Sequence, residues 1–290
     1  MSQTAVGPKS SQPYLAELSR WRADYRSRLA APHGWWSLTN LSWLEPGENL
    51  LGSAPEARLP LPSHLPPRVA LLDLGPGGVT ITPLVGGLRA NDQPLDGPIT
   101  TASDLDLYTG SAPEAAKVNL IRRKELYGVR TYDPVTARAN DAILDVSWFE
   151  PNEALIFDAE FLPPAAGEVI DVSNVLGQVS PQPVAGRLAF EFAGRSHSVV
   201  ATAASGGRLF VNFCDATNGG AKGAQAAIGA AKTYGGGRFL YPAGPVDGRV
   251  RLDFNFAHHP PCAHTPYAVC PMPVAENRLP FAVAAGERYG

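Results

Sequence analysis

Residues 248–255 read Gly-Arg-Val-Arg-Leu-Asp-Phe-Asn, and polar and apolar side chains alternate along them. A period of two is typical of a strand that buries one face in an antiparallel sheet. The segments 155–161, 188–192 and 209–213 alternate in the same way, and Gly194 separates the second of them from another β-rich run at 196–202. These patterns predict that residues 136–290 form an antiparallel β-sandwich or barrel containing a hairpin.

The polar face of the 248–255 strand is the first candidate for a site. Val250, Leu252 and Phe254 take the buried positions, so the remaining side chains are expected to share the opposite face, namely Arg249, Arg251, Asp253 and Asn255. If that face is solvated, it is an ordinary charged exterior. If it lines a concave surface, Arg251 and Asp253 supply a donor fork and an acceptor at one place.

A glycine-rich segment precedes this strand, and it reads Tyr234-Gly235-Gly236-Gly237-Arg238. Glycine lacks a Cβ and tolerates a positive φ, so the backbone here can approach other groups closely. Two interpretations follow from the residues. Three backbone N–H groups beside Arg238 form an anion-binding nest, or the segment is a sharp turn before a strand.

A proline- and cysteine-rich loop follows the strand. Cys262 and Cys270 are eight positions apart among five prolines. This spacing excludes a C-x₂-C zinc knuckle. A zinc site with histidines, a disulfide or a reactive thiol stays open, and the histidines concerned are His258, His259 and His264. Buried thiols are favoured, because free cysteine behaves as a small hydrophobe. We therefore expect no metal and no cofactor.

The chain then reads Glu276-Asn277-Arg278. Buried charges are rare unless they are paired, so Arg278 is predicted to pair with Asp253 or Glu276. Asn277 and Arg278 are also ligand-binding candidates.

Several quoted segments resemble the bacterial and archaeal family called domain of unknown function 1684. They extend over nearly the whole chain: Trp21-Arg, Gly34-Trp-Trp-Ser-Leu, Trp43-Leu-Glu-Pro-Gly, Tyr234-Gly-Gly-Gly-Arg-Phe-Leu, Asp253-Phe-Asn, Pro260-Pro-Cys-Ala, Cys270-Pro-Met-Pro and Glu276-Asn-Arg-Leu. The family has no assigned activity, so the resemblance implies no catalytic residue. His258-His259 stands where the family tends to have Tyr-Asn, and the segment 217–231 is a long insertion. The resemblance therefore implies no family-wide role for the histidine pair.

The first half is predicted to begin with a disordered N-terminus (1–12), followed by a helix and an aromatic segment (13–46). Tyr14, Leu18, Trp21, Tyr25 and Leu29 recur at helical spacing between Pro13 and Ala31. Residues 47–135 are predicted to form a small β-sandwich, with strands at 69–74, 79–84 and 118–122. The order Gly47-Glu-Asn-Leu-Leu-Gly-Ser53, strand pair, Leu88-Arg-Ala-Asn-Asp-Gln-Pro94 resembles a forkhead-associated domain, which implies a protein-interaction module.

One candidate comes from the end of this sandwich. Arg122, Arg130 and Asp133 lie on a predicted hairpin, where they either face a shared pocket or form a solvated exterior. The second alternative is favoured, because exposed strand faces are usually polar.

Composition limits the classes of function. The formal charge of −3 argues against nucleic-acid binding, which needs an excess of Lys and Arg. The 28 prolines and 29 glycines favour a turn-rich β-protein. The absence of an apolar run of 18 residues predicts no membrane span, and the absence of a signal-peptide pattern predicts a cytoplasmic location. The segment 217–231 is of low complexity and is predicted to be a flexible insertion.

The sequence therefore predicts a mainly β chain: an N-terminal helix, a forkhead-associated-like sandwich, and a second antiparallel unit with a Pro/Cys-rich C-terminal loop. The leading hypothesis is a small-molecule-binding protein or hydrolase-type enzyme for an anionic or polyhydroxylated ligand. Its site is predicted at the C-terminal motif, with these candidates: Tyr234, Gly235, Gly236, Arg238, Arg251, Asp253, Asn255, Asn277, Arg278 and Arg130. The alternatives are a non-catalytic protein-interaction module and a Cys/His metal-binding protein.

Overall fold

The computed structural model describes residues 11–110, 114–219 and 233–289, and the chain divides into two compact units. The C-terminal unit contains Met1–Ala23, Val146–His264 and Val269–Gly290, and the N-terminal unit contains Asp24–Asp145 and Thr265–Ala268. Most of the predicted disordered N-terminus, and the predicted insertion from residue 220 onward, lie outside the described residues.

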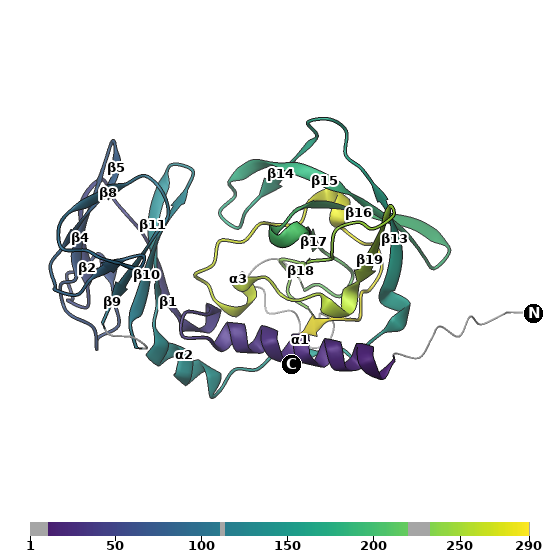
Figure 1. Cartoon of the computed structure of the whole chain (residues 1–290), viewed down its shortest axis with the longest axis horizontal. Helices are drawn as coiled ribbons and strands as arrows, with labels where there is room; N and C mark the ends of the chain where they lie inside the picture. The colour runs from purple at the N-terminus through teal and green to yellow at the C-terminus, as the bar shows by residue number, and fades with distance from the viewer. Residues whose placement is uncertain (1–10, 111–113, 220–232, 290) are drawn as a thin grey trace, which may run out of the picture. The chain divides into compact units, whose positions relative to one another are not determined.

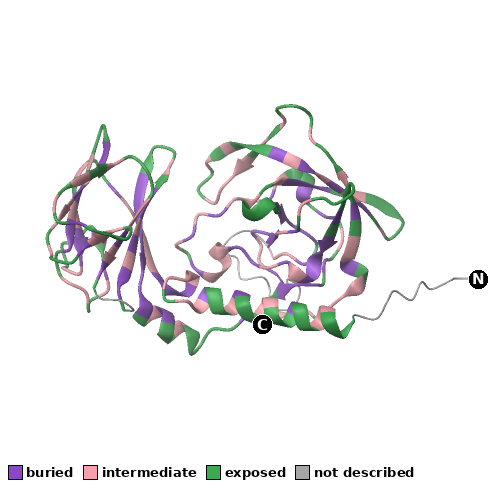
Figure 2. Ribbon diagram, in the orientation of Figure 1, coloured by how far each residue is buried: buried purple, intermediate pink, exposed green. Residues whose placement is uncertain are grey.

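Helix α1 (Gln12–Ala30) opens the described chain and confirms the predicted N-terminal helix. Leu18, Tyr25 and Leu29 are buried at the predicted helical spacing. Long stretches of the helix are exposed, as Figure 2 shows in green. Trp21 packs edge-to-face against Trp148 at 5.6 Å and against Phe256 at 5.2 Å between ring centroids. These aromatic contacts attach the first part of α1 to the C-terminal unit.

The N-terminal unit is built from two sheets (Figure 1). The six-stranded sheet has the order β1 (Leu38–Trp43), β11 (Leu126–Tyr132), β10 (Ala116–Arg123), β9 (Leu105–Thr109), β6 (Arg89–Ala90) and β7 (Gln93–Pro94). The five-stranded sheet has the order β3 (Leu59–Pro60), β2 (Gly47–Gly52), β4 (Ala70–Gly75), β5 (Gly78–Pro83) and β8 (Ile99–Thr101). All pairings are antiparallel except that of β2 with β3.

Both sheets contribute to one hydrophobic core in this unit. Leu72 and Ile81 come from the five-stranded sheet, whereas Leu107, Leu120 and Val129 come from the six-stranded sheet. Full burial of such side chains contributes about 1.5–3 kcal/mol each, so this core accounts for the association of the sheets. The likeness to a forkhead-associated domain stays a prediction.

The charged residues at the end of this unit differ from the predicted solvated exterior. Arg122 is exposed, but Arg130 and Asp133 are buried. Asp133 caps helix α2 (Pro134–Asp141) by accepting hydrogen bonds from the backbone N–H groups of Val135 and Thr136, both at 3.1 Å. The cap satisfies N–H groups that the first helical turn leaves without partners. The three residues therefore do not form one solvated exterior.

The C-terminal unit is organised by a seven-stranded antiparallel sheet that curls around its core (Figure 1). Its main path is β18 (Arg238–Leu240), β17 (Leu209–Phe213), β16 (Arg195–Ala203), β15 (Val179–Phe192), β13 (Ile156–Leu162) and β19 (Arg249–Asp253), with β14 (Val169–Ser173) paired to β15. A two-stranded sheet joins β12 (Ser147–Trp148) to β20 (Glu287–Arg288). Short helical segments are η1 (Trp35–Ser37) in the other unit, and here η2 (Glu153–Leu155), η3 (Ser205–Gly207), η4 (Phe254–Phe256), α3 (Pro261–His264) and η5 (Ala275–Asn277).

The alternating segments of the sequence form the core of this unit, as predicted. Buried positions on β15, β17 and β19 point into one cluster, which includes Leu188, Val211 and Leu252. The predicted hairpin around Gly194 is the β15–β16 pair, in which Phe192 lies opposite Arg195. The chain is therefore mainly β, with an N-terminal helix and several antiparallel sheets. Within the described residues, no helix has the length and apolar composition that a membrane span requires.

Candidate functional site

The glycine-rich segment forms a tight turn before β18. The Gly237 N–H donates to the Tyr234 carbonyl oxygen over 3.2 Å. Gly237 has a φ of +91°, and a Cβ there would lie 2.5 Å from Pro273 Cγ. A Cβ at Gly236 would lie 2.4 Å from Cε1 of Tyr234. Gly235, Gly236 and Gly237 therefore allow a sharp turn after Tyr234. In this turn the Tyr234 ring packs against the backbone at Gly236. The anion-nest interpretation stays a prediction.

Arg238 follows this turn and is completely buried. Its guanidinium donates to Asp215 Oδ2 and to the Val283 carbonyl oxygen, both over 2.7 Å. Asp215 Oδ1 accepts the backbone N–H groups of Thr217 at 2.8 Å and of Val283 at 3.0 Å. A buried ion pair persists only when hydrogen bonds compensate its desolvation. Arg238 therefore ties β18 to Asp215, two residues after β17, and to the C-terminal segment.

Asp253, at the end of β19, is the centre of a second polar network. Its carboxylate accepts the Tyr14 hydroxyl at 3.2 Å, the Arg251 guanidinium at 3.0 Å and the Asn255 side-chain amide at 3.0 Å. Asn255 also exchanges hydrogen bonds with the Asn152 backbone, at 2.7 and 3.1 Å. The prediction that Asn255 shares the strand face is wrong, because the chain leaves the strand after Asp253 and Phe254–Phe256 form a 3₁₀ turn.

Asn277 and Arg278 have different environments. The buried Asn277 side chain accepts the Val200 N–H at 2.7 Å and donates to the carbonyl oxygens of Val200 and Asn212, both at 2.9 Å. It therefore fastens the C-terminal segment to β16 and β17. Arg278 is exposed. The predicted pairing of Arg278 with Asp253 or Glu276 is wrong, because Glu276 pairs with Arg187 at 3.2 Å and Asp253 with Arg251.

A buried carboxylate, Glu287 on β20, holds two histidines of the loop. Its Oε1 lies 3.2 Å from His259 Nδ1 and 3.4 Å from His264 Nε2, and its Oε2 accepts the His259 backbone N–H at 2.6 Å. Burial raises the pKa of Glu287, but the two imidazoles and the His259 hydrogen bonds more than offset it and lower that pKa to about 2. Glu287 is therefore ionised at neutral pH. We call these three residues the Glu287 cluster.

A hydrogen bond defines the tautomer of His259, one of the two imidazoles in the Glu287 cluster. His259 Nε2 accepts the Tyr234 backbone N–H at 3.2 Å, so the His259 proton lies on Nδ1, facing Glu287. Burial lowers the pKa of His264, with Glu287 opposing. Both imidazoles lie within ion-pair distance of the same carboxylate oxygen, Glu287 Oε1.

A cysteine and two tyrosines lie beside this cluster. Burial, followed by the neighbouring Cys262 side chain, raises the pKa of Tyr234. Burial and the charges of Glu287 and Cys262 raise the pKa of Tyr289 to about 12. The Tyr289 ring lies 5.0 Å from the His259 ring. Cys262 and Tyr234 are half-buried, and Tyr289 is 42% exposed. Solvent therefore reaches this group of side chains.

Cys262 and Cys270 are close in space, since the Cys262 backbone N–H donates to Cys270 Sγ over 3.2 Å. The described cysteines Cys214, Cys262 and Cys270 form no disulfide with one another. Burial raises the pKa of the Cys214 thiol, which makes that thiol a poor nucleophile. Among the described residues, no three histidine, cysteine or acidic side chains are grouped to hold a metal ion.

His258 is separate from the Glu287 cluster in its packing. It stacks on Tyr241 with the ring planes 19° apart and contacts Trp21 at 5.6 Å between centroids. Its Nδ1 lies 3.2 Å from the Phe256 carbonyl oxygen. Burial lowers the pKa of His258 to about 4, so this histidine is neutral at pH 7 and packs as an aromatic residue.

The predicted candidates therefore divide into several groups. His259 and His264 come together on Glu287, and Tyr234 donates its backbone N–H to His259, whereas Arg238 and Asp253 have separate sets of partners. Arg130 belongs to the N-terminal unit, where its guanidinium lies 5.9 Å from the Trp35 ring.

Sequence reasoning missed Glu287, Tyr289 and Asp215. Asp215 and Glu287 are the carboxylates that pair with Arg238 and with the two histidines. The one available signal was the need of a buried arginine or histidine for an anionic partner. That need does not say where in the chain the partner lies.

Comparison with known proteins gives a family and no function. The model of the family described as "Protein of unknown function (DUF1684)" matches residues 143–288, which include the Glu287 cluster and exclude the tryptophan-rich segments of the first half. No curated protein matches the chain. A similar solved structure is the solution NMR structure of an uncharacterised protein from Haloarcula marismortui, which is 28% identical with a TM-score of 0.40. The alignment covers 52% of this chain and 80% of that one.

Proposed function

The chain belongs to the family of proteins of unknown function designated DUF1684, and we propose that it binds a small polyhydroxylated molecule at its C-terminal motif and cleaves an ester of it. The observation that carries the proposal is the partly exposed Tyr234–Cys262 pair beside the buried, ionised Glu287 and its two imidazoles. Such a set combines a nucleophile, a hydrogen-bond donor and an oriented imidazole at one accessible place.

The described charges favour an uncharged ligand over an anionic one. Arg238, one of the arginines that favoured an anionic ligand at the sequence level, is buried and pairs with Asp215. Near Cys262, Glu287 is ionised and burial keeps His264 neutral at pH 7. The hydroxyl groups of Tyr234 and Tyr289 both donate and accept hydrogen bonds, which suits a ligand carrying several hydroxyl groups.

In the proposed reaction, the Cys262 sulfur attacks the ester carbonyl carbon, and the thiol proton passes by way of His264 to the alcohol that leaves. Water then attacks the thioester carbon, which releases the acid and returns a proton to the sulfur. The Tyr234 hydroxyl stabilises negative charge on the sulfur by donating to it, while the Glu287 carboxylate opposes that charge and orients His264. Atoms balance with water as the only co-reactant.

The test is hydrolysis of glycerol triacetate and glucose pentaacetate by the full chain, followed at constant pH, with trapping of an acyl adduct by mass spectrometry. We expect the Cys262→Ser variant to lose at least about 100-fold in rate, and the acyl group to map to the peptide that contains Cys262. His264→Asn should lower the rate while retaining the adduct on Cys262.

The matched control is Cys214→Ser, because Cys214 is a buried thiol. We expect this variant to hydrolyse the esters at the wild-type rate. Thermal unfolding of each variant shows whether a loss of rate reflects a loss of folding. Wild-type rates in folded Cys262→Ser, or an acyl adduct on Cys214 or Cys270, would overturn the assignment.

A further inference from the structure

The N-terminal unit contains a pocket of about 470 Å³ between the end of α1, strands β6 and β9, and Ala115, which precedes β10. It is independent of the C-terminal motif and of the function proposed above. Its lining residues are Arg28, Ala31, Pro32, His33, Gly34, Arg89, Tyr108 and Ala115. The volume falls in the range of about 300–1,000 Å³ that small-molecule sites usually occupy. Most of the lining is apolar, so the few polar groups in it determine what the pocket accepts.

The wall at the end of α1 is held in a defined conformation. His33 Nε2 lies 2.8 Å from the Ala115 carbonyl oxygen, so the ring carries a proton at Nε2 and is fixed against the residue that precedes β10. A Cβ at Gly34 would lie 2.3 Å from the Arg28 carbonyl oxygen. Glycine therefore lets the chain turn back closely on the end of the helix, which preforms this wall.

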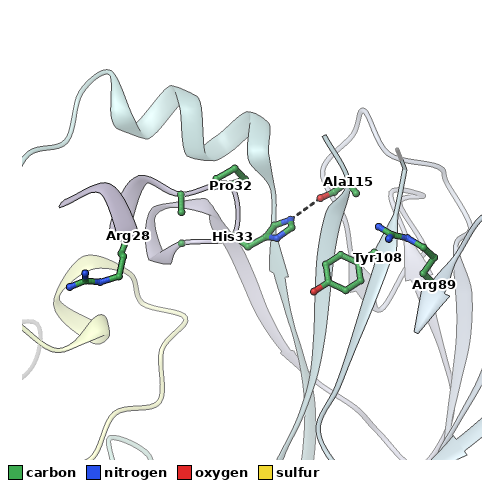
Figure 3. A pocket seen from close by; sticks show the side chains of 8 residues that line it. Arg28, Pro32, His33, Arg89, Tyr108 and Ala115 are labelled. Atoms are coloured by element: carbon green, nitrogen blue, oxygen red, sulfur yellow. Dashed lines mark hydrogen bonds between the residues drawn. The ribbon is translucent and has the colours of Figure 1, made fainter. Parts of the chain in front are cut away.

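The opposite wall presents an aromatic ring and a cation. Figure 3 shows the His33 and Tyr108 rings next to each other, with Arg89 beside Tyr108. The Arg89 guanidinium lies 5.2 Å from the centre of the Tyr108 ring, and the His33 and Tyr108 centroids are 5.7 Å apart. Burial, followed by the charge of Asp106, raises the pKa of Tyr108. The phenol is therefore uncharged at neutral pH.

Arg89 is the cation that this pocket offers to a ligand. Among the residues that the structure describes, no carboxylate lies within the 4.0 Å ion-pair distance of its guanidinium. The neighbouring Asp106 is instead held by Asn119 at 2.7 Å and by Lys117 at 3.6 Å. The other arginine, Arg28, lies 5.9 Å over the Tyr25 ring, and in Figure 3 its guanidinium points away from His33 and Tyr108.

We infer that this pocket binds a small aromatic carboxylate. The ligand ring packs on the apolar lining and on Tyr108, because offset or edge contacts between aromatic rings are favourable. The carboxylate pairs with Arg89, whose planar guanidinium presents two parallel N–H donors to a carboxylate. An uncharged aromatic ligand of the same shape packs on Tyr108 but forms no ion pair with Arg89. An aliphatic carboxylate pairs with Arg89 but has no ring to pack on Tyr108.

The probe is 1-naphthoate, titrated into the ¹⁵N-labelled full chain and followed by NMR. We expect saturable shifts at the backbone amides of His33, Gly34 and Ala115, with a dissociation constant on the order of 1 mM for a ligand of this size. Arg89→Gln should weaken binding by about 10-fold, because it removes a charge-assisted pair. The alcohol 1-naphthalenemethanol should bind the wild type about 10-fold more weakly than the acid.

Arg122→Gln is the matched control. Arg122 also lies over a tyrosine of this unit, with its guanidinium 5.4 Å from the Tyr127 ring, but outside the pocket. It should change naphthoate binding by less than about 2-fold. The inference is overturned by absence of saturable shifts up to about 10 mM naphthoate, by equal losses in Arg89→Gln and Arg122→Gln, or by equal affinity for acid and alcohol.

Discussion

Two arginine–carboxylate pairs of the C-terminal unit have similar geometry, but the arginine is buried in one pair and exposed in the other. Arg238 and Asp215 lie 2.7 Å apart with both side chains at 0% exposure. Arg251 and Asp253 lie 3.0 Å apart, with the arginine 61% exposed and the aspartate 6% exposed. Exposed pairs contribute about 0–1 kcal/mol, whereas removal of one partner from a buried pair costs about 3–5 kcal/mol. Burial, and not the distance between the charges, should therefore decide how much each pair matters.

The largest expected effect is that of Arg238→Met. The substitution leaves the Asp215 carboxylate buried without its cation and removes the hydrogen bonds to the Val283 and Ala285 carbonyl oxygens. We expect the free energy of unfolding to fall by about 3–5 kcal/mol. Urea unfolding of the full chain measures this loss, and Arg251→Met is the matched control.

A second variant covers the case in which Arg238→Met does not fold. Arg238→Lys keeps the charge and loses the planar fork, so it should be destabilised by less than Arg238→Met. A loss below about 1 kcal/mol in Arg238→Met would contradict the comparison, because it would place the buried pair in the range of exposed ones.

The buried His258 extends the comparison to an ionisable side chain that is buried in its neutral form. The pKa of His258 falls to about 4 from its ordinary 6.5. In the unfolded chain, His258 takes up a proton as the pH falls below 6.5, whereas in the folded chain it does so only near pH 4. The folded state therefore loses stability over this window, by about 2 kcal/mol at pH 5.

The measurement is the free energy of unfolding at pH 7.5 and pH 5 for the wild type and His258→Gln. The loss between these pH values should be smaller in the variant by about 2 kcal/mol. Glu287→Gln separates the carboxylate contribution. The pKa of Glu287 is lowered to about 2, so its stabilisation is present above the ordinary carboxyl range near pH 4.5 and is lost as the pH falls toward 2. An identical pH dependence in wild type and His258→Gln would contradict the assignment.

An intermediate effect is expected for Tyr14→Phe. The Tyr14 hydroxyl donates to Asp253 over 3.2 Å, and its ring packs edge-to-face on Phe256 at 6.4 Å between centroids. Phenylalanine keeps the packing and removes the hydrogen bond, which should cost about 1 kcal/mol. In Tyr14→Phe combined with Asp253→Asn, losses that add fully would show that the two groups do not interact.

The fold was predictable where the signal is local. Alternation in β15, β17 and β19 and helical spacing in α1 are set by neighbouring residues, so the sequence revealed the sheet of the C-terminal unit and the opening helix. The partners across the fold were not predictable. Arg238 pairs with Asp215, 23 residues earlier, and Tyr14 with Asp253, 239 residues later, and no spacing rule links such pairs.

The candidate site was predictable only in part, for the same reason. Tyr234, Cys262 and the histidines stand out because chemically active residue types are dense in the C-terminal motif. Glu287 lies 28 residues beyond His259, on a two-residue strand. The prediction for Asn255 was wrong because alternation was extended past the residue where β19 ends. The strand ends at Asp253, whose carboxylate accepts the backbone N–H of Asn255. A periodic pattern of side chains does not show where such a hydrogen bond ends a strand.

The smallest expected effect is that of Arg251→Ala, which tests the exposed side of the comparison. Arg251 lies 5.3 Å over the Tyr14 ring as well as beside Asp253. Solvent screening of a side chain that is 61% exposed limits both contacts, so we expect a loss of about 0.5 kcal/mol. The loss should shrink further between 0.05 and 1 M salt, because the Debye length falls to about 3 Å. A salt-independent loss above about 2 kcal/mol would mean that Asp253 behaves as a buried charge that needs Arg251, as Asp215 needs Arg238.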